Sequence, residues 1–99
     1  MNMQNLMQQA QKMQRDIQKK QEEIDATVFE GKSEWVTITM TGQRVVQSIK
    51  INKRDLSDEE DVEMLEDMIS IAVNDVLNKI AAEIETKIGA AAGGLSGLM

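Results

Sequence analysis

The sequence predicts an α+β domain made of a long N-terminal helix, a three-stranded antiparallel meander and a long C-terminal helix. Two observations lead to this prediction. Apolar residues recur every three or four positions near both ends of the chain, whereas in the middle they alternate with polar ones. The chain also has no proline, and glycines stand where the pattern changes. A length of 99 residues fits one such domain.

The first helix is predicted from about Asn2 to Asp25. Its apolar residues form a stripe in which successive members are 3, 4, 3, 4 and 7 positions apart: Met3, Leu6, Ala10, Met13, Ile17 and Ile24. Glutamine and lysine, both good helix formers, fill most of the other positions. A helix of this length extends about 36 Å.

The meander is predicted from Thr27 to Ile51, where β-branched residues dominate. A short strand at Thr27 to Glu30 precedes a second strand, in which Val36, Ile38 and Met40 share one face. The turn Thr41-Gly42-Gln43 leads to a third strand, with one face made by Val45, Ile49 and Ile51. Because three strands alone are marginally stable, helices must cover them.

The second helix is predicted to begin at Ser57-Asp58-Glu59-Glu60, which has the form of a capping box. An apolar stripe follows and ends before Gly89, which favours helix termination: Val62, Leu65, Ile69, Ala72, Val76, Ile80, Ile84 and Ile88. This helix measures about 46 Å, so it should project beyond a compact body whose radius of gyration is about 13 Å.

Three apolar residues of the second helix, Met64, Met68 and Ile71, fall outside its stripe. They imply a second buried surface, and we therefore predict a homodimer. The alternative is a monomer in which the first helix packs along the second. The domain is expected to span residues 1–88. Residues 89–99 are uncharged and rich in glycine, so we expect a flexible tail. A short docking motif is the alternative there: Leu95, Leu98 and Met99.

Composition excludes most familiar catalysis. The chain has no histidine and no cysteine, so it lacks nucleophilic triads, thiolate or imidazole zinc sites and disulfides. No signal segment or membrane span is apparent. We expect a cytoplasmic protein that is not an enzyme and has no cofactor, metal, small-molecule substrate or membrane partner. Most of the acidic residues between Asp55 and Asp67 are explained by the positive end of the second helix; a Mg²⁺ or Ca²⁺ site is the alternative.

Charge is distributed unevenly along the chain. The net charge is -6, yet residues 1–20 carry +3 and residues 32–54 carry +4, against -4 for residues 21–31 and -9 for residues 55–88. Lys12, Arg15 and Lys19 share one face of the first helix, with Lys20 at its edge. This basic ridge is either a solvated face paired with nearby acids or a surface that contacts phosphates.

Three segments of the chain resemble the YbaB/EbfC family of bacterial nucleoid-associated proteins: MNMQNLMQQAQKMQRDIQKKQEEI, VTITMTGQRVVQSIKI and LSDEEDVEMLEDMISIAVNDVLNKI. The resemblance implies a tweezer-shaped homodimer that dimerises through its β region and the nearby helix. The predicted interface is then Val36, Ile38, Met40, Met64, Met68 and Ile71.

The same resemblance implies binding of double-stranded DNA in the nucleoid with little sequence specificity, and a role in chromosome organisation and gene regulation. Carried to this chain, the DNA-binding candidates are Lys12, Arg15, Lys19 and Lys20, followed by Lys79 and Lys87. The alternative function is a protein interaction module that grips a partner with its methionine-rich helices, without a direct role at DNA.

Overall fold

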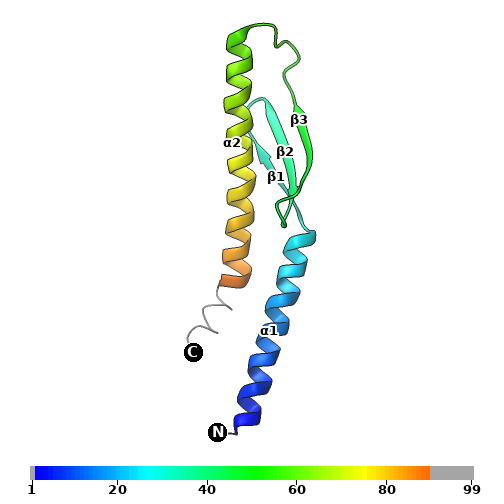
Figure 1. The fold of residues 1–99 in the computed structure, drawn as a ribbon, viewed down its shortest axis with the longest axis vertical. Coiled ribbons are helices and arrows are strands. Elements are labelled where there is room, and N and C mark those ends of the chain that lie inside the picture. The colour runs from blue at the N-terminus through cyan, green and yellow to red at the C-terminus, as the bar shows by residue number, and fades with distance from the viewer. Residues whose placement is uncertain (1, 90–99) are drawn as a thin grey trace.

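The computed structural model describes residues 2–89. It contains α1 (Met3–Ala26), β1 (Val28–Lys32), β2 (Val36–Thr41), β3 (Val46–Ile51), α2 (Glu59–Ile84) and a final π-helical turn, η1 (Glu85–Gly89). The predicted α+β class and element order are confirmed (Figure 1). The predicted tail lies outside the described residues apart from Gly89.

The three strands form one antiparallel sheet in the order β1-β2-β3. Direct cross-strand partners include Gly31 with Ile38 and Ile38 with Ile49. The register shifts between Thr39 and Met40, where β3 carries a bulge. The turn that follows β2 places Arg44 at a φ of 67°, a left-handed conformation.

The core lies between α2 and the first two strands. Val36, Ile38 and Met40 on β2 pack with residues one helical turn apart on α2, namely Ala72, Val76 and Ile80. β1 approaches α2 so closely at Gly31 that a Cβ atom there would lie 2.3 Å from the carbonyl oxygen of Ala72. Within residues 2–89, α2 does not reach β3, and all six β3 residues are exposed.

α1 is anchored only at its C-terminal end. Ile24 is its one buried residue, and residues 2–9 are all exposed. Figure 1 shows α1 leaving the sheet beside the distal end of α2 and continuing past it, with the N terminus at the far end. The molecule measures 71 × 21 × 13 Å, and its radius of gyration of 19.8 Å exceeds the value of about 13 Å for a compact chain of this size. The projecting shape is as predicted.

The start of α2 differs from the prediction. Its N-cap is Asp58, whose side chain makes no capping hydrogen bond, and the Ser57 hydroxyl donates instead to Asp55. The predicted capping box is therefore wrong, because a local turn uses the Ser57 hydroxyl. Three acidic residues still occupy the first turn, where the helix dipole favours them: Glu59, Glu60 and Asp61.

Candidate nucleic-acid interface

The basic ridge, defined as Lys12, Arg15, Lys19 and Lys20, lies in the middle of α1. The first three are exposed, and Lys20 is half-buried. At 100° per residue Lys12, Arg15 and Lys19 face nearly opposite the apolar stripe that ends at Ile24, whereas Lys20 lies beside the stripe. Because Ile24 attaches the stripe to the body, the first three cations face away from the body and are open to a large ligand.

The ridge cations are free of ion pairs in the part of the chain that the structure describes. Asp16, Glu22 and Glu23 stand three or four positions from ridge residues, yet no carboxylate oxygen of theirs comes within 4.0 Å of a ridge nitrogen. The four side chains therefore keep their hydrogen-bond donors for solvent or for a ligand. Such an array of unpaired donors suits phosphate oxygens.

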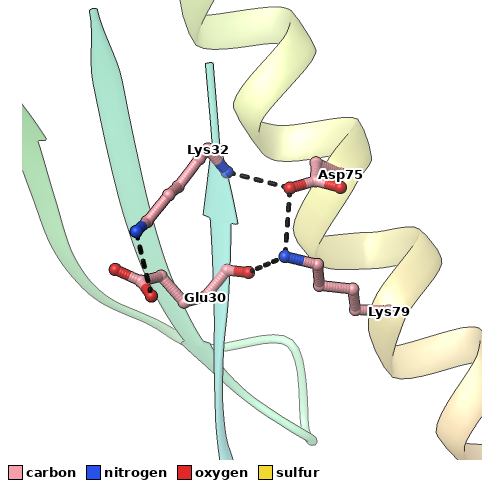
Figure 2. A network of polar contacts seen from close by, with 4 residues as sticks. All are labelled: Glu30, Lys32, Asp75 and Lys79. Carbon is pink, nitrogen blue, oxygen red and sulfur yellow. Dashed lines mark hydrogen bonds and ion pairs between the residues drawn. The ribbon is translucent and has the colours of Figure 1, made fainter. Parts of the chain in front are cut away.

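Lys79, a second-rank DNA candidate, is part of a polar bridge between α2 and β1. Its ammonium group lies 3.3 Å from Asp75 and donates to the carbonyl oxygen of Glu30 at 2.8 Å. Asp75 also accepts the backbone N–H of Lys32 at 2.9 Å (Figure 2). Two polar groups on the free edge of β1 are thus satisfied by α2 side chains.

The polar bridge lowers the pKa of its carboxyl group. The Lys32 backbone N–H, and after it the Lys79 ammonium, hold the pKa of Asp75 below its ordinary value of 3.8. Lys79 therefore has a structural part in joining α2 to β1. Lys87, the other second-rank candidate, lies 3.1 Å from Glu83 on the same helix, so both lysines differ from the unpaired ridge cations.

Three of the six predicted dimer-interface residues lie in the core of the single chain. Val36, Ile38 and Met40 are 0%, 0% and 4% exposed, because α2 covers them. They have almost no surface left for a second copy. The prediction that these three residues form the dimer interface is therefore corrected. Met64 and Ile71 are 47% and 52% exposed, and Met68 is half-buried against the core.

A second exposed apolar surface, the β3 row, consists of Val46, Ile49 and Ile51. These residues are opposite Met40, Ile38 and Val36 in the sheet and share their face, yet they are 46%, 55% and 42% exposed. The sequence placed Ile49 and Ile51 on one face with Val45, but the bulge puts Val46, and not Val45, in this row. The exposure of the row was missed, because alternation shows which face a residue shares but not how far a helix reaches across it. The outer two of three strands are about 10 Å apart, and α2 contacts only β1 and β2 in the described structure. The strand spacing is therefore the signal that one strand would stay uncovered.

The described residues contain no cluster of three or more acidic side chains placed to hold a metal ion. Between residues 2 and 89, neither long helix is apolar enough over its length to span a bilayer.

Comparison with known proteins identifies relatives over almost the whole chain. Residues 1–95 match the YbaB/EbfC DNA-binding family. A "Nucleoid-associated protein" of Lactococcus lactis subsp. cremoris is 48% identical, and the match covers 90% of this chain and 91% of the relative. A protein of the same name from Chloroflexus aurantiacus is 45% identical, with 99% of both chains covered. A third, from Enterococcus faecalis, is 43% identical over 97% of this chain and 93% of its own.

Proposed function

The chain belongs to the YbaB/EbfC DNA-binding family, and from this premise we propose that it acts as a homodimer that binds duplex DNA through the basic ridge of α1. Binding would depend on phosphates and have little sequence preference. We extend to this chain the nucleoid association stated in the names of its relatives, together with a role in chromosome organisation and gene regulation.

The observation that carries this proposal is that the ridge cations lie on a projecting helix and are unpaired among residues 2–89, although the whole chain carries a net charge of -6. Local placement therefore offsets the unfavourable overall charge. The acids of α2 would repel phosphate, which favours contact through α1 alone. The α2 lysines Lys79 and Lys87 are weaker candidates, because each already pairs with an acid.

Two exposed apolar surfaces support self-association. They are the β3 row and the flank of α2 that carries Met64, Met68 and Ile71. Asp75 and Lys79 of α2 already form hydrogen bonds with the free edge of β1. At the other side of the sheet, no helix lies over either face of β3 in the described structure. A second copy that covered the β3 row would remove this apolar surface from water. Two copies would also present two ridges to one duplex.

A gel-shift titration at several salt concentrations tests the proposal. If four ridge cations per protomer each neutralise one phosphate, a dimer binds with a log-log salt slope of about -7 or steeper. Replacing Lys12, Arg15 and Lys19 together by Gln should make the slope shallower by about 5. The dimer should persist in light scattering, because these side chains lie opposite the apolar stripe.

A control variant separates local contacts from total charge. Ser70→Glu, Asn74→Asp and Asn78→Asp together lower the net charge by the same three units at exposed positions of α2. This variant should keep the wild-type slope. Wild-type binding that is absent, or constant between 50 and 200 mM salt, contradicts the proposed function, as does equal weakening by the two triple variants.

A second candidate function, a protein interaction module, is favoured by the exposure of Met3 and Met7 at 77% and 61%. Capture of partners from bacterial extract distinguishes the two. Partners that remain bound after nuclease digestion support the interaction module, whereas loss of all partners supports DNA binding.

A further inference from the structure

A second basic segment of the chain plays no part in the ridge. Residues 32–54 contain five basic residues and one acidic residue, so their net charge of +4 exceeds the +3 of residues 1–20. The fold converts most of this segment into β2, β3 and the ends that flank them. The position of each cation on the sheet therefore decides what the segment can bind.

The sheet register places two of these lysines in one row. Lys32 of β1 is directly opposite Thr37 of β2, and Thr37 is directly opposite Lys50 of β3. Directly opposite residues share a face, so the three side chains lie side by side. The outer two are about 10 Å apart at the backbone. The next row on the same face contains Glu30, Thr39 and Ser48.

These rows lie on the face that α2 does not cover. The alternate residues Val36, Ile38 and Met40 point toward α2 and form the core, so Thr37 and Thr39 point to the other side. We call this side the hydroxyl face and define it as Lys32, Thr37, Thr39, Ser48 and Lys50. The acidic residues of α2 lie behind the sheet, which separates them from the hydroxyl face.

The lysines of the hydroxyl face are available to a ligand. Lys50 is exposed and has no ion-pair partner among the described residues. The Lys32 ammonium is 3.7 Å from Glu30, but both side chains are more than half exposed, and such pairs are worth about 0–1 kcal/mol. By contrast, Lys53 is bonded to Asp61 at 3.3 Å and lies 4.1 Å from the centre of the Trp35 ring, so it is already engaged.

We propose that the hydroxyl face is a second surface for the phosphate backbone of duplex DNA, separate from the ridge on α1. Lysine ammonium groups and serine or threonine hydroxyls both donate to phosphate oxygens and carry no base specificity. The proposal rests on the proposed function, since it extends the same DNA contact onto the sheet. The competing explanation is a polar face that contacts only water.

The test compares the salt dependence of DNA binding by full-length variants. Lys32→Gln with Lys50→Gln removes two cations per protomer, so the log-log slope should become shallower by about 3.6 for a dimer. The backbone bond from Lys32 to Asp75 does not need the lysine side chain. The variant should therefore fold, as circular dichroism and Trp35 fluorescence would show.

Two further variants make the result decisive. Asn74→Asp with Asn78→Asp lowers the net charge by the same two units on α2 and should keep the wild-type slope. The ridge variant with Lys12, Arg15 and Lys19 changed to Gln should retain weak, salt-dependent binding that is lost when Lys32→Gln and Lys50→Gln are added. If Lys32→Gln with Lys50→Gln binds like the α2 control, the hydroxyl face makes no contact while the ridge still does. If the wild type does not bind DNA, the proposed function fails and the second surface with it.

Discussion

Single residues determine how the sheet is joined to α2 and to α1. Asp75 accepts a hydrogen bond from the Lys32 backbone and lies beside Lys79, while Gly31 and Gly42 allow close backbone approach. Sequence patterns indicated that Gly42 would occupy a turn. They gave no indication of the bridge, because Asp75 and Lys32 are 43 positions apart and meet only in the folded chain.

At this scale we predict a pH dependence that originates at Asp75. A carboxyl whose pKa is lowered in the folded state stabilises the fold above its unfolded pKa, and this contribution is lost as the pH falls through the folded value, below 3.8. Asp75→Asn should therefore lower the urea midpoint at pH 7 and leave a smaller difference between pH 7 and pH 3 than the wild type shows. Asp16→Asn, which removes an exposed carboxylate without a described ion pair, is the control. An unchanged pH profile in Asp75→Asn would show that the bridge does not contribute to stability.

Gly42 makes a second prediction at the residue scale. A Cβ atom at position 42 would lie 2.0 Å from the carbonyl oxygen of Ile24 and 2.9 Å from its side chain. Gly42→Ala should therefore destabilise the protein by about 1–3 kcal/mol or more, because backbone must move. In the control Gly89→Ala, the new atom meets the Glu85 carboxylate, the flexible end of a side chain. Urea denaturation should show a clearly larger loss for Gly42→Ala, and equal losses would contradict the close-contact explanation.

Among the elements, α1 shows best what periodicity can and cannot predict. The spacing of its apolar residues predicted the helix to within one residue at each end, because helix formation follows local pattern. The same spacing did not show that Ile24 alone is buried, since burial depends on where the rest of the chain lies. The face of the ridge was predictable for the same local reason, whereas its lack of ion pairs depends on side-chain conformation.

The difference between the ends of α1 gives a prediction for this element. Ile24 is 1% exposed and packs where α1 joins the body, whereas Leu6 on the same stripe is 44% exposed. Ile24→Ala should cost about 2–5 kcal/mol of stability, as for other large-to-small changes in a core. Leu6→Ala should cost well under half as much in the same urea titration. A comparable loss for Leu6→Ala would mean that the distal stripe is also packed in solution.

For the whole molecule, its length and its uncovered surfaces are connected. The chain extends 71 Å because α1 and the distal part of α2 project beyond a sheet of only three strands. Helix lengths read from the sequence predicted this projection. The position of the uncovered apolar surface was not predictable, because Ile49 and Ile38 share a face of the sheet and only the reach of α2 distinguishes them. The proposed dimer interface therefore moves from the β2 residues to the β3 row, together with the flank of α2.

At the scale of the whole molecule, we predict that self-association and DNA affinity both depend on the β3 row. Ile49→Asp places a charge at a position that is 55% exposed in the single chain, so the folded protomer should tolerate it while a dimer that buries Ile49 should not. Light scattering should then show a monomer with unchanged circular dichroism. Its salt slope for DNA should be about half that of the wild type, because one copy neutralises half as many phosphates. Gln47→Asp, at an exposed position of the same strand, controls for the added charge. A dimer that survives Ile49→Asp would place the interface elsewhere, and a monomer with the full salt slope would separate DNA binding from dimerisation.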